Sequence, residues 1–218
     1  MRSSHSEIHR IDGVGVDLER FRPCTDRRQR MELRGQLGFD GDDFIVTVVA
    51  ELNRNKNQMA LVRAAPTLQA RIPRLKILLI GRETEPDVRK YVESHGLRDV
   101  VLFLGYRNDV ERILAISDVG FSASLREGLP VNIIESMACG LPILCSDNRG
   151  HRSLVSHLET GLMFDVADTA SLIDYLVLLH KNPSLRQEMG ARNAIAARKF
   201  SLCEVLPRMQ EIYTEMMK

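Results

Sequence analysis

The chain reads KILLIG at residues 76–81, an apolar run that has no polar alternation and ends in glycine. Such a run is typical of a central strand in a parallel sheet, because both faces of that strand are covered by helices. A second run, FIVTVVA at residues 44–50, is rich in β-branched residues and has the length of a strand. Amphipathic segments separate these and later runs. The alternation predicts repeated strand–helix units and an α/β fold with a doubly wound parallel sheet.

The full pattern predicts about six strands and a helical tail. Strands are expected at residues 44–50, 75–80, 100–104, 119–123, 142–146 and 161–164. Helices are expected at residues 57–71, 86–95, 108–116, 130–139 and 150–155. From residue 169 onward only helical periodicity remains, and breaks at Asn182–Pro183 and near Phe200–Ser201 divide it into three helices.

These elements divide the chain into three parts. Residues 1–42 form a polar lead-in segment, residues 43–168 a Rossmann-like domain, and residues 169–218 a set of C-terminal helices packed on that domain. The last helix has an apolar stripe at helical spacing, made of Val205, Met209, Ile212 and Met216. We expect that this helix either folds back on its own domain or leaves Met209, Ile212 and Met216 partly exposed, which favours dimerisation.

The composition excludes several classes of protein. An apolar content of 44% over 218 residues is ample for a buried core. Because 30 Lys and Arg face 29 Asp and Glu, no long-range field attracts nucleic acid, and we expect no nucleic-acid partner. The four cysteines lack CxxC spacing, which favours reduced thiols and a cytoplasmic location. The start MRSSHSEIHRIDG has no apolar run of the kind found in signal peptides.

The stretch REGLPVNIIESM at residues 126–137 places two carboxylates around a helix start. Pro130 suits the first helical position, and the free amides beside it can face an anion. Glu127 lies just before this start, and Glu135 lies about 7 to 8 Å along the helix axis. Stabilisation of the helix dipole explains Glu127 but explains Glu135 poorly, because Glu135 is in the second turn. A ligand with hydroxyl groups at both ends and phosphate between them fits this order, as in a nucleotide-sugar.

Further polar residues follow the strands, at the edge where doubly wound sheets bind ligands. Lys56 follows the first strand and could pair with a phosphate, although a solvated surface lysine is the plain alternative. Arg82 follows the second strand, next to Gly81, which allows a ligand to approach the backbone. Tyr106 and Arg107 follow the third strand and could frame a base. Any one of these residues could be polar only because its loop is exposed to water. The argument for a site is that all of them lie at the same edge of the sheet.

Other chemistries lack their motifs. The six histidines form no HExxH pair and no cluster with cysteine at metal-ligand spacing, so we expect no metal and no cofactor. The sequence also lacks a GxSxG elbow, a GxxxxGK[ST] phosphate loop and a GxGxxG after the first strand, which argues against a hydrolase, an NTPase and an NAD enzyme. His151 and Arg152 open the helix after the fifth strand. They could reach the ligand cleft, but we expect them to face solvent.

Six stretches, in order along the chain, resemble the C-terminal, nucleotide-sugar-binding domain of group 1 (family 4) retaining glycosyltransferases. These enzymes have the GT-B fold, and the resemblance is to the bacterial capsule and exopolysaccharide sugar transferases above all. The stretches are GVGVDLERFRP, VVAELNRNKNQ, LLIGRE, VLFLGYRNDV, SLREGLPVNIIESMACGLPIL and GLMFDVAD. They cover nearly the whole chain, and the two glutamates with seven residues between them in an EGLP setting are the most specific part.

The resemblance implies roles for these residues toward a donor that we expect to be a UDP-sugar. Glu127 would hold hydroxyls of the donor sugar, and Glu135 the ribose diol. Lys56 would stabilise the departing nucleoside diphosphate, which makes Glu127 and Lys56 the implied catalytic residues. The diphosphate would lie along the backbone of Gly128, Leu129, Pro130 and Val131, while Tyr106 and Arg107 would contact the base and Arg82 would belong to the loop after the second strand. The family's reaction retains the anomeric configuration without a metal.

The sequence departs from the family pattern in two ways. Many relatives have arginine five residues before the lysine, where this chain has Glu51, and Arg54 is a substitute. Only about a dozen residues precede GVGVD, so we expect the acceptor-binding N-terminal domain of these enzymes to be missing from this chain. The chain would then bind donor weakly and transfer little sugar without a separate partner domain. Any peripheral membrane association would come through that domain. Two alternatives stay open: a non-catalytic module that binds a nucleotide-sugar or a partner, and a GT-B nucleotide-sugar epimerase.

Overall fold

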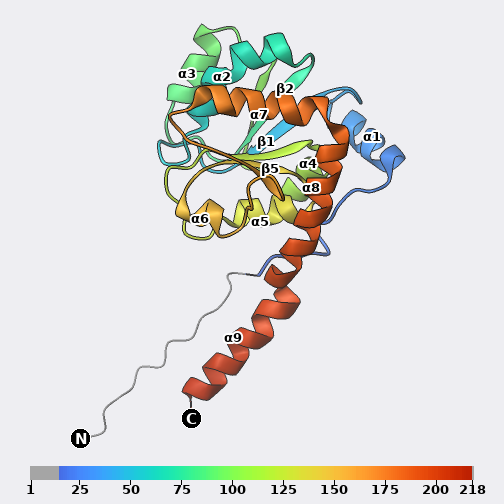
Figure 1. The fold of residues 1–218 in the computed structure, drawn as a ribbon, viewed down its shortest axis with the longest axis vertical. Helices are drawn as coiled ribbons and strands as arrows, with labels where there is room; N and C mark the ends of the chain where they lie inside the picture. Colours follow the sequence, from blue (N-terminus) through green and yellow to red (C-terminus); the bar gives the residue numbers. More distant parts are fainter. Residues whose placement is uncertain (1–14, 218) are drawn as a thin grey trace, which may run out of the picture.

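Six parallel strands form one sheet in the computed structural model, which describes residues 15–217 (Figure 1). The strands are β1 (Phe44–Val49), β2 (Leu75–Ile80), β3 (Val101–Gly105), β4 (Val119–Ser122), β5 (Ile143–Ser146) and β6 (Gly161–Phe164). Their order across the sheet is β3-β2-β1-β4-β5-β6. All six predicted strands are therefore confirmed, with their ends within one residue of the predicted bounds.

Helices connect the strands and form the C-terminal part. They are α1 (Arg27–Gln36), α2 (Gln58–Arg71), α3 (Asp87–Ser94), α4 (Val110–Ile116), α5 (Val131–Ala138), α6 (Arg149–Arg152), α7 (Thr169–Lys181), α8 (Pro183–Ala196), the 3₁₀ turn η1 (Ala197–Phe200) and α9 (Leu202–Met216). The helices predicted between strands and both tail breaks are confirmed. Their ends lie within two residues of the predicted bounds, except that α6 ends three residues early, at Arg152. The chain turns there, because Leu154 and Val155 N–H both donate to His151 O.

Helices cover both faces of the sheet, which explains why its strands show no polar alternation. Helices α2, α3 and α7 lie on one face, where Val46 and Val48 belong to the larger core cluster. Helices α1 and α4 lie on the other face against Ile45, Leu78 and Ile80. Helix α5 covers β4 and β5 on that second face and is itself covered by α8. The two-sided burial confirms the doubly wound architecture.

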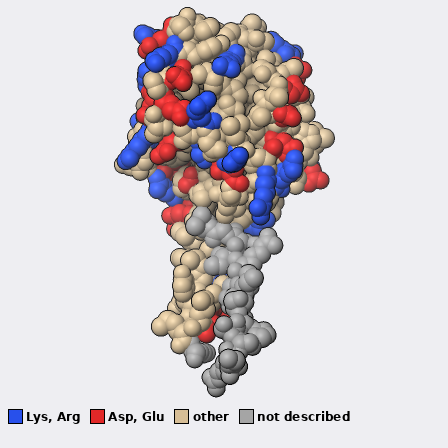
Figure 2. All heavy atoms as spheres, turned by 90° about the vertical axis from the view of Figure 1, so that its left-hand side faces the viewer, with Lys and Arg blue, Asp and Glu red and all other residues tan. Residues whose placement is uncertain are grey.

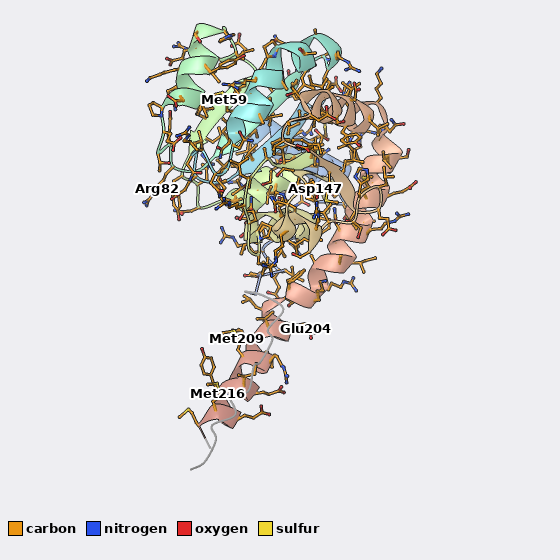
Figure 3. The ribbon with its side chains drawn as sticks, turned by 60° about the vertical axis from the view of Figure 1, so that its left-hand side comes forward. Met59, Arg82, Asp147, Glu204, Met209 and Met216 are labelled. Carbon is orange, nitrogen blue, oxygen red and sulfur yellow. The ribbon has the colours of Figure 1, made fainter. Side chains whose placement is uncertain are left out.

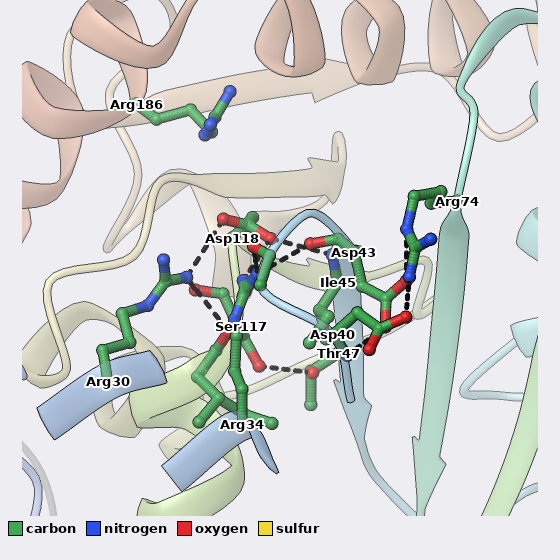
Figure 4. Close-up of polar contacts among 12 residues, drawn as sticks. Arg30, Arg34, Asp40, Asp43, Ile45, Thr47, Arg74, Ser117, Asp118 and Arg186 are labelled. Atoms are coloured by element: carbon green, nitrogen blue, oxygen red, sulfur yellow. Dashed lines mark hydrogen bonds and ion pairs between the residues drawn. The ribbon is translucent and has the colours of Figure 1, made fainter. Parts of the chain in front are cut away.

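Helix α1 lies inside the lead-in segment, where the sequence predicts no helix. Its buried inward residue is Arg34, so the helix lacks the apolar stripe by which helices are recognised. Arg34 and Arg30 donate to the two oxygens of Asp118, at 2.8 Å and 3.0 Å (Figure 4). Asp118 Oδ2 also accepts from Ile45 N–H at 2.9 Å. A charged network at the start of β1 and β4 thus anchors α1, in addition to the packing of the half-buried Leu33 and Leu37.

Helix α9 extends away from the α/β domain, as Figure 1 and Figure 3 show. Val205 and Ile212 are buried, whereas Met209 is half-buried and Met216 is 72% exposed. The expected exposure is confirmed for Met209 and Met216 and wrong for Ile212. Tyr213, in the outer part of the helix, is also exposed.

The charges on the surface and the lengths of the helices are two further features of the structure. Figure 2 shows basic and acidic side chains interspersed over the face of the domain that it displays, in keeping with a net charge of +1. Within residues 15–217, every helix is too short or too polar to cross a bilayer.

Candidate functional site

The strand order predicts a ligand crevice at the carboxyl ends of β1 and β4. These strands are neighbours, but the chain leaves β1 toward α2 on one face and leaves β4 toward α5 on the other. Ligands of doubly wound sheets bind at such a switch point, beyond the carboxyl ends of the strands. The β1–α2 loop contains Lys56, and the β4–α5 loop contains Glu127. Two residues predicted from separate motifs therefore border the same crevice.

Lys56 and Glu127 form a direct ion pair across this crevice. The distance from Lys56 Nζ to Glu127 Oε1 is 2.6 Å, and the two side chains are 25% and 11% exposed. The backbone holds the two loops together as well, because Leu125 N–H donates to Asn55 O at 2.8 Å. Asn57 has a φ of 50°, a left-handed conformation that turns the loop into α2. The structure thus assembles both predicted catalytic residues into one partly buried unit.

The start of α5 lies beside this ion pair. The helix begins at Val131, with Pro130 as its N-cap, one residue later than predicted. Among the described residues no side chain caps this helix, and Ile133 N–H donates to Pro130 O. Asn132 Nδ2 donates to Val49 O at 2.8 Å and so fixes the helix start at the end of β1. Uncapped amides and the helix dipole make this position attractive to an anion such as a diphosphate.

The backbone of residues 128–131 has an accessible part. Gly128 is exposed, Leu129 and Val131 are half-buried, and Pro130 is buried. This arrangement leaves room for a ligand along the loop where the resemblance places the diphosphate.

Glu135 lies in the second turn of α5, near Arg20 and Glu111. Burial raises the pKa of Glu135 to about 7; the positive charge of Arg20 opposes this shift, and the carboxylate of Glu111 adds to it. Arg20 is engaged elsewhere, since its Nη2 lies 2.7 Å from Glu111 Oε2. At neutral pH, Glu135 is therefore a mixture of acid and carboxylate, and it can donate a hydrogen bond to a diol as well as accept one.

Replacing Glu135 with glutamine is expected to stabilise the fold at high pH. The raised pKa means that ionising Glu135 costs folding free energy, and this cost grows as the pH rises from about 4.5 to about 7. Above that window, we expect Glu135→Gln to raise the free energy of unfolding on the order of 1 to 3 kcal/mol. Urea denaturation at pH 4.5 and pH 8 measures the difference. The exposed Glu188, replaced by glutamine, is the control, and an equal effect of Glu135→Gln at both pH values would contradict the expectation.

The other predicted binding residues lie at the same edge of the sheet, and they differ in whether their side chains are already bound to a neighbouring residue. The guanidinium of Arg82 lies 5.5 Å from the centroid of the Tyr106 ring, and Tyr106 is 68% exposed. Figure 3 shows Arg82 at the outer edge of the domain. Arg107 is engaged by Asp109 through contacts of 2.8 Å and 2.6 Å, so its guanidinium does not share in this pair. Arg54 is exposed. The Arg82–Tyr106 pair is thus the better platform for a base.

His151 contradicts its predicted position. Its side chain is fully buried, with Nδ1 2.7 Å from Ser146 O, whereas Arg152 is exposed and paired with Asp147 at 2.8 Å. The expectation that both residues face solvent is wrong for His151, because α6 packs its first turn against the loop that holds Glu127. The adjacent Gly150 was the available signal, since glycine often marks a close approach of two backbone segments.

Two hollows on the surface of the described residues lie away from the Lys56–Glu127 pair. One, of about 450 Å³, lies along α9, and another, of about 540 Å³, lies beside the edge strand β3. Neither includes Lys56, Glu127 or Glu135. In the described part of the chain, no three His, Cys, Asp or Glu side chains are grouped to hold a metal ion. The site is an open edge that offers paired charges and helix amides.

The chain belongs to the family of glycosyl transferases group 1, whose model matches residues 29–195. It is 35% identical over 209 residues to the EpsD protein of Bacillus subtilis (strain 168), named as a glycosyltransferase, and the match covers 95% of this chain and 55% of EpsD. It is 30% identical to the UDP-Gal:alpha-D-GlcNAc-diphosphoundecaprenol alpha-1,3-galactosyltransferase of Escherichia coli, with 93% of this chain and 53% of the enzyme covered. The chain therefore spans about half the length of these relatives.

Solved structures show the same fold. Anabaena HepE, solved in complex with UDP and glucose, matches with a TM-score of 0.81 at 24% identity, over 93% of this chain and 55% of HepE. The C-terminal domain of the group 1 glycosyl transferase LpcC from Francisella tularensis matches with a TM-score of 0.73 at 18% identity, over 86% of this chain and 100% of that domain. The fold is thus that of one GT-B half, as predicted.

Proposed function

We propose that this chain is the donor-binding domain of a retaining glycosyltransferase, and that its ligand is a UDP-sugar used to build a polysaccharide or glycoconjugate. The main support is the Lys56–Glu127 pair, 2.6 Å apart at the switch point and next to the uncapped start of α5. An activated sugar requires a cation and free amides for its diphosphate, and a carboxylate that accepts hydrogen bonds from the sugar hydroxyls. This position offers all three. A relative named for the use of UDP-Gal and the HepE complex with UDP favour uracil as the base.

Each residue has a role in this proposal. Glu127 accepts hydrogen bonds from hydroxyls of the sugar, and Glu135 binds the ribose diol. Lys56 and the amides of residues 128–131 neutralise the diphosphate as it departs, so no metal is needed for that charge. Arg82 and Tyr106 hold the base between a cation and an aromatic ring.

The acceptor site belongs to a second domain in this proposal. A transferase site must hold two substrates and exclude water, and the crevice described here has one wall. The chain covers 55% of EpsD, which leaves room in that relative for the other wall. Alone, the chain binds donor weakly and transfers little or no sugar. The four free cysteines fit a reducing cytoplasm, where such a transferase would meet its donor.

Calorimetry tests the proposal. We expect UDP and UDP-sugars to bind the 218-residue chain more tightly than GDP or ADP, and Glu135→Ala to weaken UDP binding by about tenfold, because a hydrogen bond to a charged group contributes about 1.5 to 3 kcal/mol. Glu188→Ala is the exposed control. If a well-folded sample binds none of these nucleotides, the proposal is wrong.

Two other functions are separated by activity measurements. A non-catalytic binding module would bind a nucleotide-sugar but gain no transferase activity when mixed with an acceptor domain from a relative such as EpsD. An epimerase would convert the sugar of its nucleotide-sugar without transferring it, which product analysis detects. The direct pairing of Lys56 with Glu127 favours the transferase, because it places a cation where a diphosphate would depart.

A further inference from the structure

The first turn of α6 lies in direct contact with the backbone of Glu127. A Cβ atom at Gly150 would lie 2.6 Å from both the Cβ and the carbonyl oxygen of Glu127. Contacts this short do not occur between folded segments, and the backbone on the other side cannot rotate away as a flexible side chain could. Glu127 can therefore occupy its position only because residue 150 is glycine.

The next residue, His151, ties the same turn to the start of the Glu127 loop. Asn148 Oδ1 accepts from His151 N–H at 3.0 Å, and Asn148 Nδ2 donates to Ser124 O at 2.8 Å. Ser146 Oγ donates to the same oxygen of Ser124 at 2.6 Å, and Ser146 O lies 2.7 Å from His151 Nδ1. These contacts join β5 and α6 to Ser124, three residues before Glu127.

The imidazole of His151 is enclosed and has one nitrogen without a partner. The side chain is fully buried, and Nε2 has no hydrogen-bond partner among the described residues. Burial lowers the pKa of His151; the Ser146 carbonyl and the carboxylates of Glu127 and Asp147 oppose that shift, while the ammonium of Lys56 adds to it. Because the pKa lies below its ordinary value, the ring is neutral at pH 7. Its Nδ1 lies 2.7 Å from Ser146 O and 2.9 Å from Asn148 Nδ2.

We infer that the first turn of α6 is the seat that positions Glu127 for the donor sugar, with Gly150 giving the close backbone contact and neutral His151 locking the turn to Ser124. Both are positioning residues, because Gly150 has no side chain and the His151 side chain is fully buried, so that each acts through the backbone of the Glu127 loop. The inference rests on the proposed function for the role of Glu127, but the seat itself is measurable without a ligand.

The seat has a defined dependence on pH. A second proton on His151 would place a cation in an enclosed space close to Lys56, where Nε2–H has no acceptor. Because the folded pKa of His151 is below its ordinary value, the seat is stable above about pH 6.5 and weakens as the pH falls toward the lowered pKa. The Glu127 loop should therefore loosen over the pH range in which His151 gains its proton, and protonation of the other histidines should have no effect on it.

Hydrogen exchange of the Glu127 loop, followed by NMR on the 218-residue chain, tests the seat without any nucleotide. We expect Gly150→Ala to raise the exchange rate of the Leu125 amide at least about tenfold, since this amide donates to Asn55 O. Gly35→Ala is the matched control, because a Cβ at Gly35 meets nothing within 4 Å. In the unsubstituted chain, the Leu125 and Gly128 resonances should shift with the midpoint of His151 and not with that of the exposed His95.

Two substitutions at His151 separate ring volume from hydrogen bonding. His151→Asn keeps a polar group near the position of Nδ1 and should retain slow exchange at Leu125, whereas His151→Phe keeps only the ring and should not. Binding of UDP-glucose relative to UDP should fall about tenfold in Gly150→Ala and His151→Phe, because Glu127 contacts the sugar and not the nucleotide.

Unchanged loop exchange in Gly150→Ala, or a Phe variant that behaves like the parent, overturns the inference. If the parent chain binds no nucleotide while the variants loosen the loop as expected, the proposed function fails and the seat stands. If His151→Phe does not fold, the Gly150→Ala comparison and the pH titration of the parent chain decide the matter.

Discussion

Substitutions of Lys56 and Glu127 are expected to change UDP binding in opposite directions. Lys56→Ala should weaken UDP binding by about ten- to a hundredfold, because a hydrogen bond from a charged donor contributes about 1.5 to 3 kcal/mol. Glu127→Gln should strengthen it by up to about tenfold. In the parent chain the Glu127 carboxylate lies 2.6 Å from the ammonium and competes with the diphosphate for it. Two like charges about 5 Å apart repel by about 3 kcal/mol at an effective dielectric constant of 20, and solvent reduces this further.

The same Glu127→Gln change should lower transferase activity once an acceptor domain is supplied, because glutamine is a weaker acceptor for the sugar hydroxyls than a carboxylate. Calorimetry with UDP and with UDP-glucose measures the binding, and Lys90→Ala and Glu188→Gln are the exposed controls. A loss of UDP affinity in both variants would show that Glu127 contacts the nucleotide itself, and the assignment of Glu127 to the sugar would then be wrong.

The fold was predictable from the sequence wherever apolar spacing reported burial. The run KILLIG at residues 76–81 has no polar alternation because helices cover both faces of β2, and the same reason applies to β1. Breaks at Asn182–Pro183 and Phe200–Ser201 were predictable because proline at the first position and serine at the N-cap start new helices by local chemistry.

Helix α1 and the seat of α6 were not predictable in this way. Arg34 and His151 are buried polar residues, so the one-dimensional pattern of hydrophobicity reports them as surface positions. Each is buried because of partners far along the chain or across a turn: Asp118 for Arg34, and Ser146 with Asn148 for His151. The spacing of apolar residues does not report such polar partners, whether they are distant, as Asp118 is, or local, as Asn148 is.

The candidate site lies between these cases. Motifs and strand order together were sufficient to place Lys56 and Glu127 at one edge, because parallel strands have their carboxyl ends at the same side of the sheet. They did not specify the direct ion pair, nor the diversion of Arg107 to Asp109. Side-chain partners depend on rotamers and loop geometry, which the positions of the strands leave undetermined.

The strand β4 links the site to the rest of the fold through both of its ends. Its amino end begins after Asp118, which binds α1, and its carboxyl end leads to Glu127 at the crevice. Between them only the residues Val119–Ser122 form the strand. A change that displaces the start of β4 should therefore affect donor binding as well as stability.

Replacing Asp118 with alanine is expected to lower the free energy of unfolding by about 3 to 5 kcal/mol, the range found when one partner of a buried ion pair is removed. Arg34 would keep its carbonyl partners Ile116 and Gly41, but its charge would stay buried without a counter-ion, and Ile45 N–H would lose its acceptor. Urea denaturation at pH 7 measures the change. Asp174→Ala is the matched control, because it removes the exposed pair with Arg71, whose side chains are 43% and 66% exposed, and should cost at most about 1 kcal/mol. Equal effects of the two substitutions would mean that packing, and not the charged network, holds α1 to the sheet.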